Sequence, residues 1–119
     1  MPDVLDEING LKDLNEPDWD SYGAEPVSRE AIAYASKFVQ QVWSQLGYRP
    51  QASAGPRPGG GVSLIWRGSK DCMIEVCFDP IQPRSPSYIL TQGSELLGKG
   101  SVEDLRNFAK KILGPIAFR

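Results

Sequence analysis

The spacing of the apolar residues changes midway through the chain, and this change limits the folds that the chain can adopt. Between residues 28 and 46 the apolar side chains recur every three or four residues, which is typical of one buried helix face. They are Ile32, Ala35, Phe38, Val39, Val42, Trp43 and Leu46. From Val62 the apolar residues alternate instead with a period of two, which is typical of a half-buried β-strand. The chain therefore combines helix with sheet.

Capping residues mark both ends of the predicted helix. Ser28 precedes the first apolar residue, and a serine side chain can accept a hydrogen bond from a free backbone N–H at a helix start. Gly47 follows the last apolar residue and suits the left-handed turn that ends many helices. We therefore predict a helix from Ser28 to Leu46.

The alternating segment predicts a β-hairpin. Residues 62–67 form its first strand, 68–71 a short loop, and 72–78 the returning strand. One face of the first strand would carry Val62, Leu64 and Trp66, and the other would carry Ser63, Ile65 and Arg67. We expect a third strand at 87–91 and a short fourth one at 95–97.

Three further segments complete the pattern. Residues 3–14 predict a short, marginal helix. Residues 48–61 contain three prolines and three consecutive glycines, and they predict a mobile connector. Ser101, followed by Asp104 in the manner of a capping box, predicts the start of a closing helix that ends near Leu113.

Together these elements predict an α+β fold, in which an antiparallel meander of three or four strands carries two or three helices on one face. A chain of 119 residues has the usual size of one domain. We divide it into an acidic arm over 1–27, with the marginal helix and an ordered loop, and a helix–sheet–helix body over 28–119. The expected core includes Phe38, Val42, Leu64, Ile74, Val76, Leu105 and Phe108.

The net charge of −2 hides an uneven distribution. From Met1 to Glu30 there are nine acidic and two basic residues, a net charge of −7, whereas the rest of the chain carries six acids and eleven bases, a net of +5. Such a division indicates an acidic arm and a basic body. The acidic arm either packs on the basic body of its own chain or binds a basic surface of a partner.

The longest apolar runs are only a few residues, far short of the roughly 20 that a membrane-spanning helix needs. The first residues are acidic and no apolar segment of signal-peptide type follows them. We therefore expect a cytoplasmic protein with no membrane association.

The chain contains no histidine and only two cysteines. Without histidine, the common general base and the common partner of a nucleophile are both missing. Cys72 and Cys77 would lie about 16 Å apart along an extended strand, which is too far for a disulfide bond. Two thiols are also too few for a structural zinc site. We therefore expect no enzyme activity, no metal and no cofactor.

Two features that suggest ligands are incomplete. The segment from Gly93 to Gly100 fits G-x-x-x-x-G-K, but Gly100 stands where a phosphate-binding loop needs serine or threonine. We therefore interpret the segment as a turn that leads into a helix. The basic residues are scattered, without the concentrated face that is typical of nucleic-acid readers, so nucleic acid is not the expected partner.

Two segments carry a resemblance to known proteins. They are Trp19-Asp20-Ser21-Tyr22-Gly23-Ala24-Glu25-Pro26 and Gly59-Gly60-Gly61-Val62-Ser63-Leu64-Ile65-Trp66. They resemble a W-D-G-x-G-A-x-P-like loop and a P-x-G-G-V-x-L-x-W strand found in a widespread group of small uncharacterised bacterial and phage proteins. Ser21 departs from the glycine that is commoner there. The resemblance implies a similar layout and a bacterial or phage origin, and it implies no activity.

Two hypotheses about function follow. In the first, the protein is a non-catalytic interaction module, such as an antitoxin, an immunity protein or an inhibitor, which masks the surface of another protein. Its acidic arm could occupy a basic channel of that partner. In the alternative, the domain binds a small ligand or acts on one, in a pocket where Trp19, Asp20 and Tyr22 lie beside Trp66 and Arg67. In either case Trp19, Asp20, Tyr22 and Arg67 are the candidate partner-binding residues.

Overall fold

A computed structural model describes residues 4–14, 26–57, 59–68, 70–82 and 84–113. Its elements follow the chain in this order: α1 (Val4–Gly10), η1 (Leu11–Asp13), α2 (Arg29–Leu46), β1 (Ala52–Pro56), β2 (Val62–Arg67), β3 (Cys72–Phe78), β4 (Ser87–Gln92), β5 (Glu95–Ser101), α3 (Leu105–Asn107) and η2 (Phe108–Leu113). The last of these is a π-helix.

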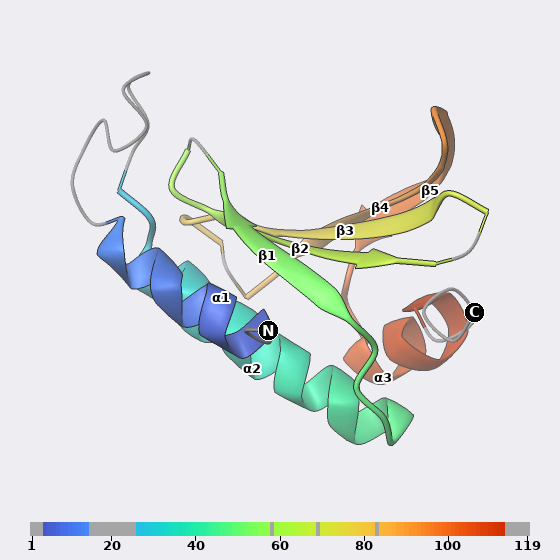
Figure 1. Ribbon diagram of the computed structural model, residues 1–119, viewed down its shortest axis with the longest axis horizontal. Helices are drawn as coiled ribbons and strands as arrows, with labels where there is room; N and C mark the ends of the chain where they lie inside the picture. The colour runs from blue at the N-terminus through green and yellow to red at the C-terminus, as the bar shows by residue number, and fades with distance from the viewer. Residues whose placement is uncertain (1–3, 15–25, 58, 69, 83, 114–119) are drawn as a thin grey trace.

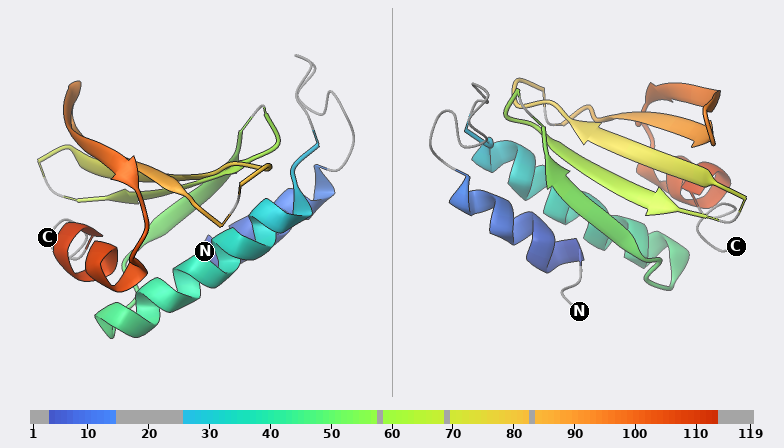
Figure 2. Two further views of the ribbon diagram at one scale, coloured as in Figure 1. Left: turned by 180° about the vertical axis from the view of Figure 1, so that it is seen from behind. Right: turned by 45° about the horizontal axis from the view of Figure 1, so that its top comes forward.

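The five strands form one sheet in the order β1-β2-β3-β4-β5, and every neighbouring pair is antiparallel. The sheet is therefore a meander. Figure 1 shows α1, α2 and α3 on the same side of it, and the two further views in Figure 2 agree. The α+β fold with helices on one face is confirmed, with five strands in place of the three or four expected.

The helix predicted from Ser28 to Leu46 is present as α2. Ser28 Oγ accepts a hydrogen bond from the backbone N–H of Ala31 at 3.2 Å, and Gly47 adopts the left-handed conformation with φ of 78°. The buried face of the helix packs on the sheet through residues at three- and four-residue steps. They are Ala31, Ile32, Ala35, Phe38, Val39 and Val42.

Aromatic rings join α2 to the sheet and to the closing helix. The Phe38 ring lies 5.4 Å from that of Phe78, 5.9 Å from that of Phe108 and 6.3 Å from that of Trp66, measured between centroids. Six of the seven predicted core residues are buried, and the seventh, Leu105, is only partly buried against the core. It lies in the first turn of α3, at the edge of the helical layer.

The described part of the acidic arm packs on its own body. Val4, Ile8 and Leu11 are buried in the common core. Glu7 Oε2 accepts a hydrogen bond from the backbone N–H of Ala54 in β1 at 3.3 Å. The Glu7 carboxylate therefore occupies the N–H of Ala54 on the edge strand. This N–H would otherwise be free to pair with a strand of another chain. The expected ordered loop around Trp19 and Tyr22 lies outside the described residues.

The prediction of a mobile connector over 48–61 is wrong, because this segment contains β1. Ala52 pairs with Trp66 and Pro56 with Val62. Proline cannot donate a backbone hydrogen bond, but an edge strand has one side that needs no partner strand, so proline is tolerated there. Gly60, with φ of 93°, makes the turn into β2.

The prediction that Ser101 caps the closing helix is also wrong. Ser101 is the last residue of β5, which is longer than the expected strand at 95–97. Asp104 is the N-cap instead, and its Oδ1 accepts a hydrogen bond from the backbone N–H of Asn107 at 3.2 Å. Ser101 pairs with Ser87 of β4, so the strand continues to this residue and the helix can begin only after it.

Replacing Phe108 by alanine should cost about 3–5 kcal/mol of unfolding free energy, because the ring is buried against Phe38 and Tyr88. Urea denaturation followed by circular dichroism measures this. Leu105→Ala is the matched control on the same helical segment, and it should cost less because Leu105 is only partly buried. A loss below about 1 kcal/mol for Phe108→Ala would remove this ring from the core.

Glycine is required at Gly61 and not at Gly55. A Cβ on Gly61 would collide with the backbone carbonyl oxygen of Phe78, whereas a Cβ on Gly55 would meet nothing within 4 Å. Gly61→Ala should therefore destabilise the protein by about 1–3 kcal/mol. Gly55→Ala should be neutral or stabilising, since it removes backbone freedom from the unfolded chain. Equal melting temperatures for the two variants would contradict this packing.

Candidate functional site

The sheet has an open face, opposite the helices. Strand register places three rows of residues on this face, and we use the name open face for these rows. They are Gly55, Ser63, Cys77, Ser87 and Ser101; Ser53, Ile65, Glu75, Ile89 and Lys99; and Arg67, Met73, Thr91 and Leu96. Figures 1 and 2 show none of the described helices on this side.

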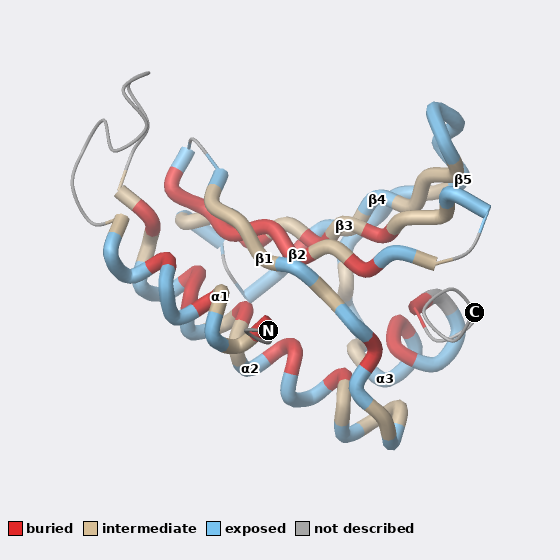
Figure 3. Tube along the Cα trace, in the orientation of Figure 1, coloured by how far each residue is buried: buried red, intermediate tan, exposed pale blue. Residues whose placement is uncertain are grey.

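Four apolar side chains lie in two neighbouring rows of the open face. Ile65 and Ile89 flank Glu75 in the middle row, and Met73 and Leu96 flank Thr91 in the end row. Ile89 is 39% exposed and Leu96 is 54% exposed, and Ile65 and Met73 are partly buried. In Figure 3, β5 is exposed along most of its length, whereas β2 is mostly buried. Exposed apolar residues that gather on one face, with polar residues around them, commonly mark an interaction surface.

The β4–β5 hairpin curves away from the helices, toward the side of the open face (Figures 1 and 2). The register shift at Leu90 and Thr91 accounts for this bend, since an extra residue in one strand increases the local twist. A hollow of about 410 Å³ lies at this end of the sheet, lined in part by Arg67, Met73 and Thr91. The open face is therefore not flat.

A bonded polar cluster extends from Ser63 and Cys77, in the row at the other end of the open face, to Glu75 in the middle row. Ser63 Oγ donates a hydrogen bond to Glu75 Oε2 at 2.5 Å. Arg57 Nη1 lies 3.5 Å from the same carboxylate oxygen and donates to Cys77 Sγ at 3.1 Å. The carboxylate of Glu75 is therefore already bound within the protein.

The environment of Cys77 does not favour a reactive thiolate. Burial raises the pKa of this thiol, and the Glu75 carboxylate raises it further, while the Arg57 guanidinium opposes both by lowering it. The net result is a pKa above the ordinary value. Because the thiolate is the nucleophile, this position suits a structural thiol. Both cysteines are free, as their spacing predicts.

The structure describes only one of the four residues singled out in the sequence. Trp19, Asp20 and Tyr22 lie outside the described residues. Arg67 is exposed on the open face. Trp66 is 0% exposed and lies on the helix-covered face, so the expectation that Trp66 and Arg67 line one pocket is wrong. Adjacent residues of a strand point to opposite faces.

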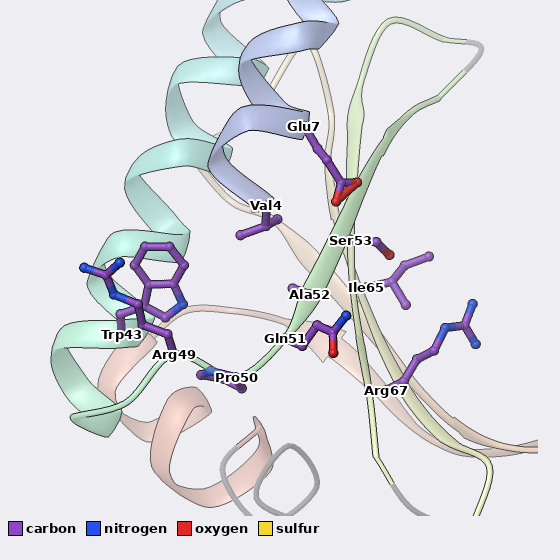
Figure 4. A pocket seen from close by; sticks show the side chains of 10 residues that line it. All are labelled: Val4, Glu7, Trp43, Arg49, Pro50, Gln51, Ala52, Ser53, Ile65 and Arg67. Atoms are coloured by element: carbon purple, nitrogen blue, oxygen red, sulfur yellow. The ribbon is translucent and has the colours of Figure 1, made fainter. Parts of the chain in front are cut away.

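Arg67 also lines a larger cleft of about 780 Å³ at the β1 edge. Figure 4 shows Ile65 and Arg67 on one side of β1, and Val4 and Trp43 on the other. The Arg49 guanidinium stacks over the Trp43 ring, 4.6 Å from its centroid. The two arginines therefore do not converge on a common point.

The described residues give little support to a metal site, a phosphate-binding loop or a membrane-spanning helix. No three carboxylate or thiol side chains there gather closely enough to hold a metal ion. The Gly93-to-Gly100 segment is the β4–β5 turn and β5 itself, so no helix begins directly after it, as a phosphate-binding loop requires. None of the described helices combines the length and apolar content that crossing a bilayer needs.

Comparison with protein-family models, with curated proteins and with solved structures finds no match to this chain.

The rate at which Cys77 is alkylated should depend on its two charged neighbours. In a Cys72→Ser background, Glu75→Gln should lower the pKa of Cys77, because it removes a negative charge that disfavours the thiolate. Arg57→Gln should raise it. Iodoacetamide labelling across a pH series measures both shifts, and a rise in the pKa with Glu75→Gln would contradict the cluster as described.

Proposed function

We propose that this protein is a non-catalytic interaction module that binds another protein through the open face of its sheet. The observation that carries the proposal is the position of Ile89 and Leu96, two large apolar side chains left exposed on a sheet face that no described helix covers. In a soluble domain such a face is commonly covered by a partner. An antitoxin, an immunity protein or an inhibitor of bacterial or phage origin could mask a partner in this way.

The open face is a better candidate interface than the acidic arm. In the described part of the arm, α1 packs against α2 and β1, and the Glu7 carboxylate binds the backbone of β1. An arm that inserts into a basic channel would have to leave these contacts. The open face needs no such rearrangement, because its exposed residues are held by the β-ladder itself.

Features of the open face support binding rather than catalysis. The Glu75 carboxylate and the Cys77 thiol of this face are both held in the cluster with Arg57. The raised pKa of Cys77 makes it a poor nucleophile at neutral pH.

The alternative, a small-ligand or enzymatic role that uses Trp19, Asp20, Tyr22 and Arg67, has weaker support. Arg67 does line the cleft at β1, but Trp43 and Arg49 lie across the strand from it (Figure 4). A small ligand is usually held by polar groups that converge on it.

Substitution of the exposed apolar residues tests the proposal. The double variant Ile89→Asp, Leu96→Asp should lose the protein partner that wild type retains in stoichiometric amount from a lysate of its source cells, because charges would replace the centre of the interface. Its unfolding free energy should change by less than about 1 kcal/mol, since both residues are exposed.

Ile81→Asp is the matched control. Ile81 is 86% exposed but lies in the β3–β4 connection, away from the open face. It should keep the partner. If wild type recovers no stoichiometric partner at low salt, or if the Ile81 variant loses it while the open-face variant keeps it, the proposed interface is wrong.

A further inference from the structure

We infer that the partner presents an acidic protein surface to the open face, with carboxylates placed around an apolar centre. This inference rests on the proposed function and adds the chemistry of the partner. It is drawn from the balance of charge on the open face and from the positions of its basic residues.

The charges on and beside the open face do not cancel. The ion pair between Arg57 and Glu75 uses the one acidic residue of the three rows. Arg67 and Lys99 remain, and neither has a carboxylate within ion-pair distance among the described residues. Arg67 and Lys99 outnumber Glu75 in the three rows, so the open face carries a net positive charge, although the whole chain has a net charge of −2. Asp71 of the β2–β3 turn lines the same hollow as Arg67 but forms no ion pair with it.

The two basic residues border the apolar residues. Lys99 lies directly opposite Ile89, and Arg67 directly opposite Met73, in the strand register. Three strand spacings, about 14 Å, separate β2 from β5, so Arg67 and Lys99 lie at opposite corners of the two rows that hold the apolar side chains. Glu75 and Thr91 lie between those apolar side chains. A partner that fills the centre would bring its own rim against both cations, where carboxylates are complementary.

A second copy of this chain is a poor occupant. Packing two open faces against each other would bring two Arg67 and two Lys99 side chains into one interface. The Glu75 carboxylates could not compensate them, because each is already bound by Arg57 and Ser63. Like charges in an interface weaken association, so identical faces are not complementary.

Nucleic acid is also a poorer occupant than an acidic protein. Nucleic-acid affinity comes largely from many phosphate contacts, whereas the open face offers two free cations beside four apolar side chains. Ile65, Met73, Ile89 and Leu96 would have no counterpart along a phosphate backbone. An apolar centre with a charged rim is the usual composition of a protein interface.

Paired charge reversals on the full-length chain test the inference. The probe is a helical peptide of glutamate and leucine with one apolar and one acidic face, titrated at low salt and followed by NMR amide shifts. The open-face variant is Arg67→Glu, Lys99→Glu. The control is Lys110→Glu, Lys111→Glu, which makes the same change in net charge at two exposed residues of η2.

We expect the peptide to shift amides of β2 to β5, with affinity about tenfold or more weaker in the open-face variant and nearly unchanged in the control. Equal weakening in both variants would show that only net charge matters, and it would overturn the inference. Tighter binding of a DNA duplex or single strand than of the peptide would overturn it too. If the reversal leaves peptide and cellular partner bound while the Ile89 and Leu96 variant loses the partner, the acidic chemistry fails and the proposed interface stands.

Discussion

The Phe38 ring holds the two layers of this fold together. It projects from the middle of α2 and meets Trp66 of β2, Phe78 of β3 and Phe108 of η2. These contacts lie on one face of the sheet. The apolar side of each central strand therefore faces the helices. The opposite side of the same strands is then left without a covering layer. The open face is thus a direct consequence of how the core is packed.

The two edges of the sheet are protected from pairing with another chain in different ways. At β1, helix α1 lies alongside the strand and Glu7 binds the N–H of Ala54. At β5, the features that discourage strand addition are a lysine, two glycines and the register shift. Pairing of β1 with β2 also forms the hairpin that brings Arg57 to Glu75 and Cys77. The β1–β2 hairpin therefore has two effects: it forms the edge that α1 covers, and it places Arg57 beside Glu75.

Much of the fold could be predicted from the sequence, because its main elements follow local rules. The helix from Ser28 to Gly47 has regular spacing and good caps, and the hairpin of 62–67 with 72–78 alternates cleanly. β1 could not be found in this way, because its glycine and its proline, Gly55 and Pro56, disfavour a strand and only pairing at an edge makes it acceptable. The wrong prediction of a cap at Ser101 has a similar cause, since the pairing of Ser101 with Ser87 depends on the sheet and not on local sequence.

The candidate site was less accessible to sequence reasoning. Alternation correctly placed Arg67 on the uncovered side of β2, but the same alternation should have separated it from Trp66. The grouping of Ile89, Leu96 and Lys99 required the register of β4 and β5, which contains an irregularity that no sequence pattern shows. The charge balance of the open face required the position of Arg57, and hence β1.

Photo-cross-linking in living source cells tests most directly whether a partner protein binds the open face. A photoreactive residue is placed either at Ile89 or at Gln40. Ile89 lies on the open face, whereas Gln40 is exposed on the outer side of α2. We expect one discrete protein adduct from position 89 and none from position 40. A discrete adduct from position 40, with none from position 89, would show that the helices rather than the sheet meet the partner.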